Sequence, residues 1–101
     1  MKNNELQVLV DFFNTYERKC EEADAVYKYL ESIERYDRAE HYKQERNEWD
    51  IKRLTIERLL SEFYNFSVNK NRLTTTIRCG QLTGKYAHNV YEYRYMSIVN
   101  E

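Results

Sequence analysis

Residues 4–68 contain no proline and no glycine, and this absence constrains the fold more than any other feature of the sequence. Proline and glycine are the residues that most often interrupt helices, because proline lacks a backbone N–H and glycine is too flexible. The stretch therefore predicts helix over nearly all of its length. At 101 residues the chain has the size of one domain, so we expect residues 1–101 to fold as a single unit.

Apolar residues in the first part of this stretch recur at alternating intervals of three and four. The series is Leu6, Leu9, Phe13, Tyr16, Cys20, Ala23, Tyr27 and Leu30. Such spacing lines one face of a helix and is typical of coiled coils and helical bundles. It predicts that this face packs against another helix.

The sequence leaves open whether residues 4–68 form one helix or two. A single continuous helix would be about 95 Å long, at about 1.5 Å per residue. A helical hairpin needs a turn, and the best candidate is the tetrapeptide 37–40, whose Asp-Arg-Ala-Glu pattern is typical of a helix start. In that case Asp37 would cap the second helix.

The distribution of apolar residues favours the hairpin. The dense apolar stretches 6–30 and 49–68 lie about equally far from residue 39, so a turn near that point would bring them together. Leu30 would then lie beside Trp49. We therefore predict an antiparallel, coiled-coil-like helical hairpin. The two predicted helices are residues 4–36 and residues 38–66.

The C-terminal segment changes from helical spacing to alternation. Over residues 72–79, apolar or threonine residues alternate with polar ones, and threonine and isoleucine favour strands. The three tyrosines of residues 91–95 fall on one face of a second predicted strand. We expect a β-hairpin or a three-stranded antiparallel sheet over 72–98, while a helix over 87–99 competes with the last strand. The predicted class is α+β, predominantly α.

No pattern in the sequence indicates catalysis or a bound cofactor. Neither His41 nor His88 has a cysteine or the other histidine within helical reach in the sequence. The residues three before them are Arg38 and Lys85, whereas a di-metal helical bundle needs Glu there, so no metal site is predicted. Gly80, Gly84 and Lys85 only faintly resemble a phosphate-binding loop, because the loop is one residue short and precedes a strand-like run. We expect a protein that is not an enzyme and that has no small-molecule substrate.

The sequence indicates a soluble protein of the cytoplasm. Cys20 and Cys79 are too few for a disulfide framework. Cys20 also lies on the apolar helical stripe, where a buried, reduced thiol is expected. An amphipathic stretch follows the N-terminus, so no signal peptide is predicted, and no apolar run is long enough to span a membrane.

The apolar face of the predicted hairpin is broader than one neighbouring helix can cover. We therefore expect two hairpins to pair as a homodimer in a four-helix bundle. The residues assigned to this core or dimer face are Leu6, Leu9, Phe13, Tyr16, Tyr27, Leu30, Trp49, Ile56, Leu60 and Phe63.

Two further surfaces combine aromatic side chains with charge, as the anchors of protein interfaces do. One is the predicted hairpin tip over residues 35–48. The other is the C-terminal sheet, because residues 69–101 carry five basic and two acidic residues. The residues assigned to partner binding are Tyr36, His41, Tyr42, Arg72, Arg78, Lys85, Tyr91, Tyr93, Arg94 and Tyr95.

The composition resembles that of small proteins of phages and mobile elements from AT-rich bacteria, which are rich in Asn, Lys, Glu and Tyr. This resemblance implies a protein that binds a host protein as an inhibitor or adaptor. The leading hypothesis is thus a non-enzymatic protein-interaction protein. The alternative is a small nucleic-acid-binding regulator, because arginine and tyrosine on one sheet suit single strands. The net charge of −1 favours neither hypothesis.

Overall fold

The computed structural model describes residues 3–66 and 73–99 of the chain. The elements are helix α1 (Asn3–Ser32), helix α2 (Tyr36–Phe66), strand β1 (Leu73–Gln81), the short 3-10 helix η1 (Gly84–Tyr86) and strand β2 (Val90–Ile98). The two helices pack against each other and a two-stranded antiparallel sheet follows them. This arrangement confirms the predicted α+β class and the helical hairpin.

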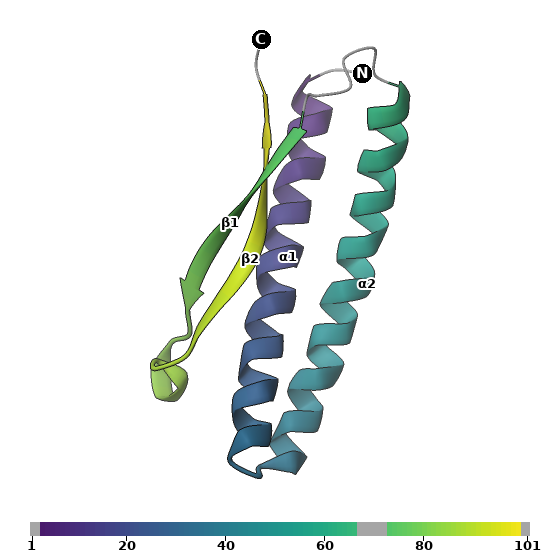
Figure 1. Cartoon of the computed structure of the whole chain (residues 1–101). Coiled ribbons are helices and arrows are strands. Elements are labelled where there is room, and N and C mark those ends of the chain that lie inside the picture. The colour runs from purple at the N-terminus through teal and green to yellow at the C-terminus, as the bar shows by residue number, and fades with distance from the viewer. Residues whose placement is uncertain (1–2, 67–72, 100–101) are drawn as a thin grey trace.

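Helix α1 is the central element of the molecule. It packs against α2 along one side and against β2 along another, while β1 lies outside β2 (Figure 1). The molecule measures 51 × 22 × 17 Å. These dimensions exclude the single continuous helix that the sequence left open.

The turn between the helices comes earlier than the sequence indicated. Helix α1 ends at Ser32 rather than at 36, and α2 begins at Tyr36, so Asp37 lies inside the first turn of α2 instead of capping it. The early turn also shifts the pairing of the helices. Leu30 packs with Ala39, whereas Trp49 faces Tyr16, so the predicted pairing of Leu30 with Trp49 is wrong.

Backbone hydrogen bonds explain where α1 stops. The N–H of Arg35 donates to the carbonyl of Leu30 at 2.8 Å, and the N–H of Glu34 donates to that of Glu31 at 3.1 Å. These two bonds form a Schellman motif, which closes a helix when one residue adopts a left-handed conformation. Glu34 adopts it, with φ 63°. Glycine usually occupies this position, and its absence is why the sequence pattern gave no stop signal here.

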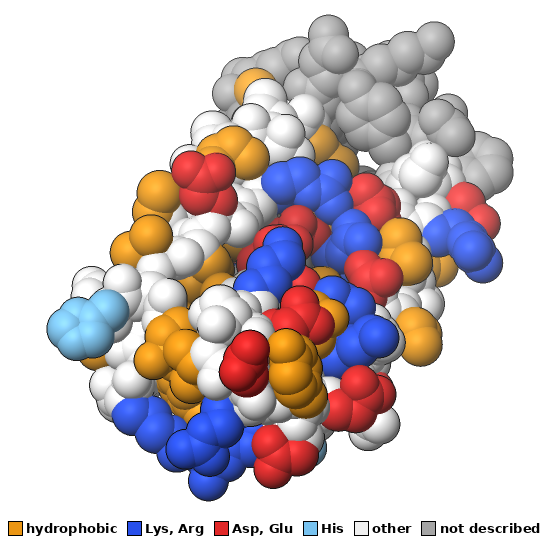
Figure 2. Space-filling view, turned by 60° about the horizontal axis from the view of Figure 1, so that its bottom comes forward, with side chains coloured by type: hydrophobic (Ala, Val, Ile, Leu, Met, Phe, Trp, Pro, Cys, Tyr) orange, Lys and Arg blue, Asp and Glu red, His pale blue; other side chains and the backbone are white. Residues whose placement is uncertain are grey.

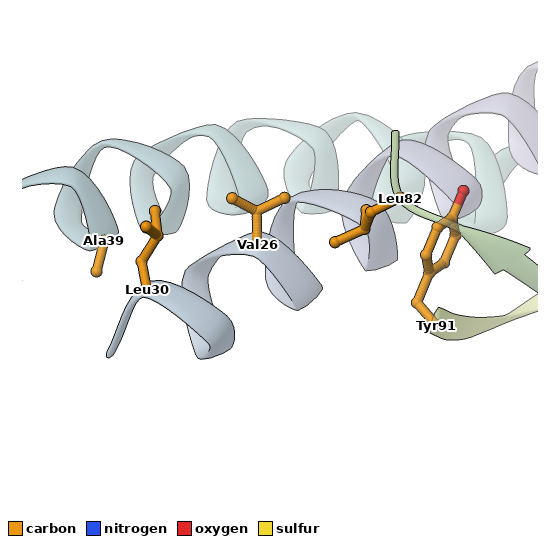
Figure 3. Close-up of a cluster of buried hydrophobic side chains, with 5 residues drawn as sticks. All are labelled: Val26, Leu30, Ala39, Leu82 and Tyr91. Atoms are coloured by element: carbon orange, nitrogen blue, oxygen red, sulfur yellow. The ribbon is translucent and has the colours of Figure 1, made fainter. Parts of the chain in front are cut away.

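The core consists of two clusters along α1. The cluster near the open end contains Leu6, Val10, Phe13 and Leu60. The cluster near the turn contains Val26, Leu30, Ala39, Leu82 and Tyr91 (Figure 3). The second cluster joins α1, α2, β2 and the residue that follows β1, so the sheet contributes to the same core as the helices.

Within residues 3–66 and 73–99 the sheet has two strands, β1 and β2, and the competing helix over 87–99 is wrong. Nine consecutive residue pairs run from Leu73 opposite Ile98 to Gln81 opposite Val90. Strand β2 meets α1 with its edge. The side-chain amide of Asn14 donates to the Met96 carbonyl at 2.9 Å and its oxygen accepts from the Met96 N–H at 2.7 Å. Asn14 thus pairs with β2 as a residue of a third strand would.

Gly80 gives the ring of Tyr91 the space it occupies. The two residues lie opposite each other in the sheet, and a Cβ at Gly80 would lie 2.4 Å from Cζ of Tyr91. The ring therefore lies across the glycine and reaches the turn-end cluster. Glycine is required at this position because of the close approach.

Because the backbone of Glu34 adopts a left-handed conformation, we expect Glu34→Gly to stabilise the protein. Left-handed geometry costs an L-residue about 1–2 kcal/mol, and glycine avoids this cost while losing more chain entropy on folding. We expect urea denaturation to show a gain of about 0.5–1 kcal/mol. As a control, Glu40→Gly lies within α2 and should lose about 1 kcal/mol. An equal loss in both variants would contradict the role of the turn.

The contact between Gly80 and Tyr91 predicts that Gly80→Ala destabilises the protein. The added methyl group must displace a buried ring, so thermal unfolding should show a loss of about 1–3 kcal/mol. In a Tyr91→Leu background the same alanine should cost much less, since the ring is gone. An unchanged cost in that background would rule out the ring as the cause.

Candidate functional site

A buried carboxylate lies where α1, α2 and β2 meet. Glu17 on α1 is only 5% exposed. Its carboxylate accepts from Nε and Nη2 of Arg94 on β2, both at 3.2 Å, and forms an ion pair with Nε of Arg53 on α2 at 3.2 Å. A buried charge needs such pairing because its desolvation is costly. Glu17 therefore ties all three elements together.

Two more acids extend this network towards the surface. Arg53 also pairs with Asp50 at 2.6 Å and with Glu57 at 3.2 Å, and Glu57 accepts from Arg94 at 3.4 Å. The hydrogen bond to Glu17 raises the pKa of Arg94 above its ordinary value. Burial would lower the pKa of Arg53, but the bond to Asp50 and the nearby carboxylates raise it overall. Both arginines thus remain charged and committed to the fold.

Glu17 was not among the predicted site residues, although its position carried a signal. Glu17 lies four residues after Phe13 and three before Cys20, which puts it on the predicted apolar face. Val10 and Asn14 are buried in the same part of α1 and were also missed. An acid on an apolar face indicates a buried ion pair, but the two arginines that complete it come from distant segments.

The predicted basic sheet does not present its arginines as a group. Arg94 binds Glu17 and Glu57, as described above. The Arg78 guanidinium lies 3.3 Å from the ring centroid of Tyr95, stacked on β2. Arg72 lies outside the described residues. Two of the predicted basic residues, Arg78 and Arg94, thus use their charge for contacts within the molecule.

The three tyrosines of β2 have different environments. Tyr91 is buried and its hydroxyl donates to Glu22 at 3.1 Å, while burial raises its pKa above the ordinary value. Tyr93 and Tyr95 are half-buried. They border a shallow groove of about 290 Å³ on the α1 side, whose other lining residues are Asp11, Asn14, Thr15 and Arg18. Of these three tyrosines, Tyr93 and Tyr95 therefore remain partly accessible, whereas Tyr91 does not.

Residues from two of the predicted surfaces meet in one cleft beside the turn. Arg38, His41 and Tyr42 come from α2, while Lys85 and Tyr86 come from η1. With Asp37 they line a cleft of about 400 Å³, here called the tip cleft. Tyr36 does not line it and is 61% exposed nearby on α2. The structure thus joins His41 and Tyr42 of the predicted tip with Lys85 of the predicted basic sheet.

Aromatic contacts hold the walls of the tip cleft in place. The rings of Tyr42 and Tyr86 meet edge to face with centroids 6.3 Å apart, and Tyr29 of α1 contacts Tyr86 in the same way at 5.9 Å. His41 lies edge-on to Tyr42 at 5.2 Å. Burial, and next the neighbouring Tyr86 hydroxyl, raise the pKa of Tyr42. The cleft is therefore preformed on packed elements.

The basic side chains of the tip cleft and its histidine remain accessible. Arg38, His41 and Lys85 are all exposed. Within the described residues, neither Arg38 nor Lys85 takes part in an ion pair. Lys85 lies near the Tyr86 ring, with Nζ 5.7 Å from its centroid. The cleft offers aromatic walls, two positive groups and one carboxylate to a ligand.

The predicted core or dimer face divides into two parts. Leu6, Phe13, Leu30 and Leu60 are buried within the chain and serve as core. Leu9, Tyr16, Tyr27, Trp49 and Ile56 are half-buried, and the side chain of Phe63 lies outside the described part of the structure. Tyr16 stacks on Phe12 at 5.8 Å and contacts Trp49 at 5.7 Å. The residues with the deepest burial are thus unavailable to a second copy.

The two cysteines lie in different environments, and both are outside the tip cleft. Cys20 is a buried free thiol, and burial raises its pKa to about 11, which keeps it protonated at neutral pH. Cys79 is free and exposed. It borders a hollow of about 760 Å³, where Asp24 pairs with Lys28 and with Arg46, each at 2.8 Å. These ion pairs lower the pKa of Asp24 although burial alone would raise it.

Two further observations concern metals and membranes. Across residues 3–66 and 73–99, no three His, Cys, Asp or Glu side chains gather as they would to bind a metal ion. Neither α1 nor α2, as far as the structure describes them, combines the length and apolar character that crossing a bilayer requires.

The buried network predicts that Glu17→Gln destabilises the protein strongly. The amide leaves two arginines without the charge that binds them, and breaking a buried pair costs roughly 3 kcal/mol when other acids remain nearby. Chemical denaturation measures the loss. The control Glu48→Gln changes an exposed acid and should stay within about 0.5 kcal/mol of the parent. An equally small loss for Glu17→Gln would show that the network contributes little.

No protein-family model matches the chain, and no curated protein or solved structure matches it either. Its own residues and their geometry are therefore the grounds on which a function can be assigned.

Proposed function

We propose that this chain is a non-enzymatic protein-binding module and that a partner protein docks in the tip cleft. The observation that carries this proposal is the meeting of two segments distant in sequence, the start of α2 and η1, around one preformed cleft. Tyrosine and arginine are the residues that most often anchor protein interfaces. Tyr42, Tyr86 and Arg38 supply both types in a single hollow.

The distribution of charge supports a protein partner over a nucleic acid. Figure 2 shows positive and negative side chains interspersed over this end of the molecule. Within the cleft, Asp37 lies beside Arg38 and Lys85. A phosphate backbone favours a continuous positive surface, whereas mixed charge suits a protein surface that carries both signs. The engagement of Arg94 with Glu17 and Glu57 points the same way.

The biological role we propose is that of a small inhibitor or adaptor of a phage or mobile element. It would act in the cytoplasm by covering a surface of a host protein. The rigid helical hairpin would present the cleft at one end, as the walls of the cleft rest on packed elements rather than on loops alone. This role rests on the compositional resemblance together with the geometry of the cleft.

A capture experiment tests this function. The tagged protein and an Arg38→Glu/Lys85→Glu variant are each incubated with lysate of the native host, and bound proteins are identified by mass spectrometry. Both substituted residues are exposed, so the fold should be retained. We expect a host protein that binds the parent and is lost with the variant, because reversed charges repel its acidic contacts.

The control variant makes the same charge change elsewhere. Arg58 is exposed and Lys19 half-buried, and neither lines the cleft, so Arg58→Glu/Lys19→Glu should keep the partner. Oligonucleotide gel shifts are run alongside with single- and double-stranded probes. A shift that weakens steeply with salt and disappears in Arg78→Glu would replace the proposal with the nucleic-acid alternative. Equal capture by both double variants would remove the tip cleft as the docking site.

A further inference from the structure

Strand β1 is the most exposed regular element of the described chain. From Thr74 to Cys79 every residue is exposed, which includes both faces of the strand, and Ile77 is 62% exposed. Figure 1 shows the later part of β1 on the far side of β2 from the helices, while the start of the strand crosses towards α1, where Leu73 packs against the open-end cluster. A strand at the edge of a sheet offers unpaired backbone groups to another strand.

The contact between Asn14 and Met96 establishes which backbone groups of β1 are unpaired within the sheet. Both backbone groups of Met96 bond to Asn14, so they point away from β1. Thr75 lies opposite Met96. In an antiparallel sheet, two opposed residues either bond to each other through their backbone groups or both point these groups away from each other. The N–H and C=O of Thr75 therefore point outward, and the alternation of the ladder extends this to residues 73, 77, 79 and 81.

A second contact agrees with this assignment. The N–H of Leu82 donates to the carbonyl of Asn89 at 2.9 Å, across the end of the same hairpin. Even-numbered residues of this strand thus bond to β2, and odd-numbered residues face the open edge. Five outward residues, at positions 73, 75, 77, 79 and 81, form a row of donors and acceptors along β1.

The usual protections of an edge strand are absent from β1. Its nine pairs with β2 run without a bulge, and it contains no proline. Arg78 is its one charged residue, and the guanidinium stacks over Tyr95 instead of guarding the edge. Proteins that must remain monomeric block such edges with charges, prolines or bulges. The open edge therefore suits strand addition.

The sequence of β1 is compatible with pairing to itself. A two-fold axis through its midpoint, Ile77, would pair all nine residues of one copy with those of another. Ile77 would meet its own equivalent, Thr75 would meet Cys79, and Arg78 would lie opposite Thr76, so no like charges are directly opposed. Each of the five residues whose backbone groups point outward would lie opposite another such residue of the second copy. Their N–H and C=O groups could then form a complete hydrogen-bond ladder.

We propose that two copies of this chain associate antiparallel through β1, centred on Ile77, to form a continuous four-stranded sheet. A two-stranded sheet is marginally stable in water, and a four-stranded one exceeds the usual threshold for stability. Because the axis is two-fold, the open β1 edges of the two copies pair with each other, so assembly stops at the dimer. This interface differs from the helix-face pairing that the sequence indicated, and it does not depend on the tip cleft.

The oligomeric state of an edge-blocked variant tests the proposal. The Ile77 N–H points outward, so Ile77→Pro blocks the edge without removing a hydrogen bond to β2. Light scattering at micromolar concentration should give twice 12.4 kDa for the parent and 12.4 kDa for Ile77→Pro, with an unchanged circular dichroism spectrum. Ile77→Val, which keeps the N–H, should remain dimeric. A monomeric parent would overturn the proposal.

Disulfide trapping tests the register independently of the proline variant. Thr75→Cys would place a thiol opposite the native Cys79 of the second copy, and oxidation should give a covalent dimer that Cys79→Ser abolishes. Thr74→Cys is the control, because its side chain lies on the other face of the strand from Cys79. Equal trapping by both cysteines, or a dimer that survives Ile77→Pro, would place the interface elsewhere. If the parent protein is a dimer but captures no host protein, that result would count only against the tip cleft.

Discussion

The structure depends on one carboxylate. Glu17 is buried between Arg53 and Arg94, and these three residues come from α1, α2 and β2. Apolar contacts between helices tolerate sliding, whereas a bidentate ion pair is specific in distance and direction. The carboxylate therefore sets the register of the helical hairpin and the position of the sheet at the same point.

The position of β2 determines which surfaces remain open. The strand meets α1 with its edge, held by Arg94 at Glu17 and by Met96 at Asn14. Most of strand β1 consequently lies away from the helices with its outer edge exposed, while Leu73 at its start packs against the core cluster near the open end. At the other end of the hairpin, the same placement brings η1 against the start of α2 and forms the tip cleft. The position of β2 against α1 therefore determines both proposed contact surfaces, the one for a partner protein and the one for a second copy.

Much of the fold could be predicted because the spacing of residues within short segments of the sequence indicates it. The helical stretch, the alternation of the strands and the closure into a hairpin all follow from residue spacing. The turn was misplaced by a few residues because Glu34 takes a left-handed position that glycine normally signals. Of the site residues, His41, Tyr42 and Lys85 were expected, but as parts of two separate surfaces. Glu17 was missed since its partners lie 36 and 77 residues further along the chain.

The sequence by itself determined the local character of this protein: a long helical stretch without breakers, then alternating strand patterns, the last with tyrosines on one face. These are consequences of periodicity, which acts within a few residues. Only the tertiary structure decided which charges are buried, which tyrosines are accessible and which strand edge is open. Those properties arise when distant segments meet, because the desolvation of Glu17 and the space above Gly80 exist only once α1, α2 and the sheet are packed together.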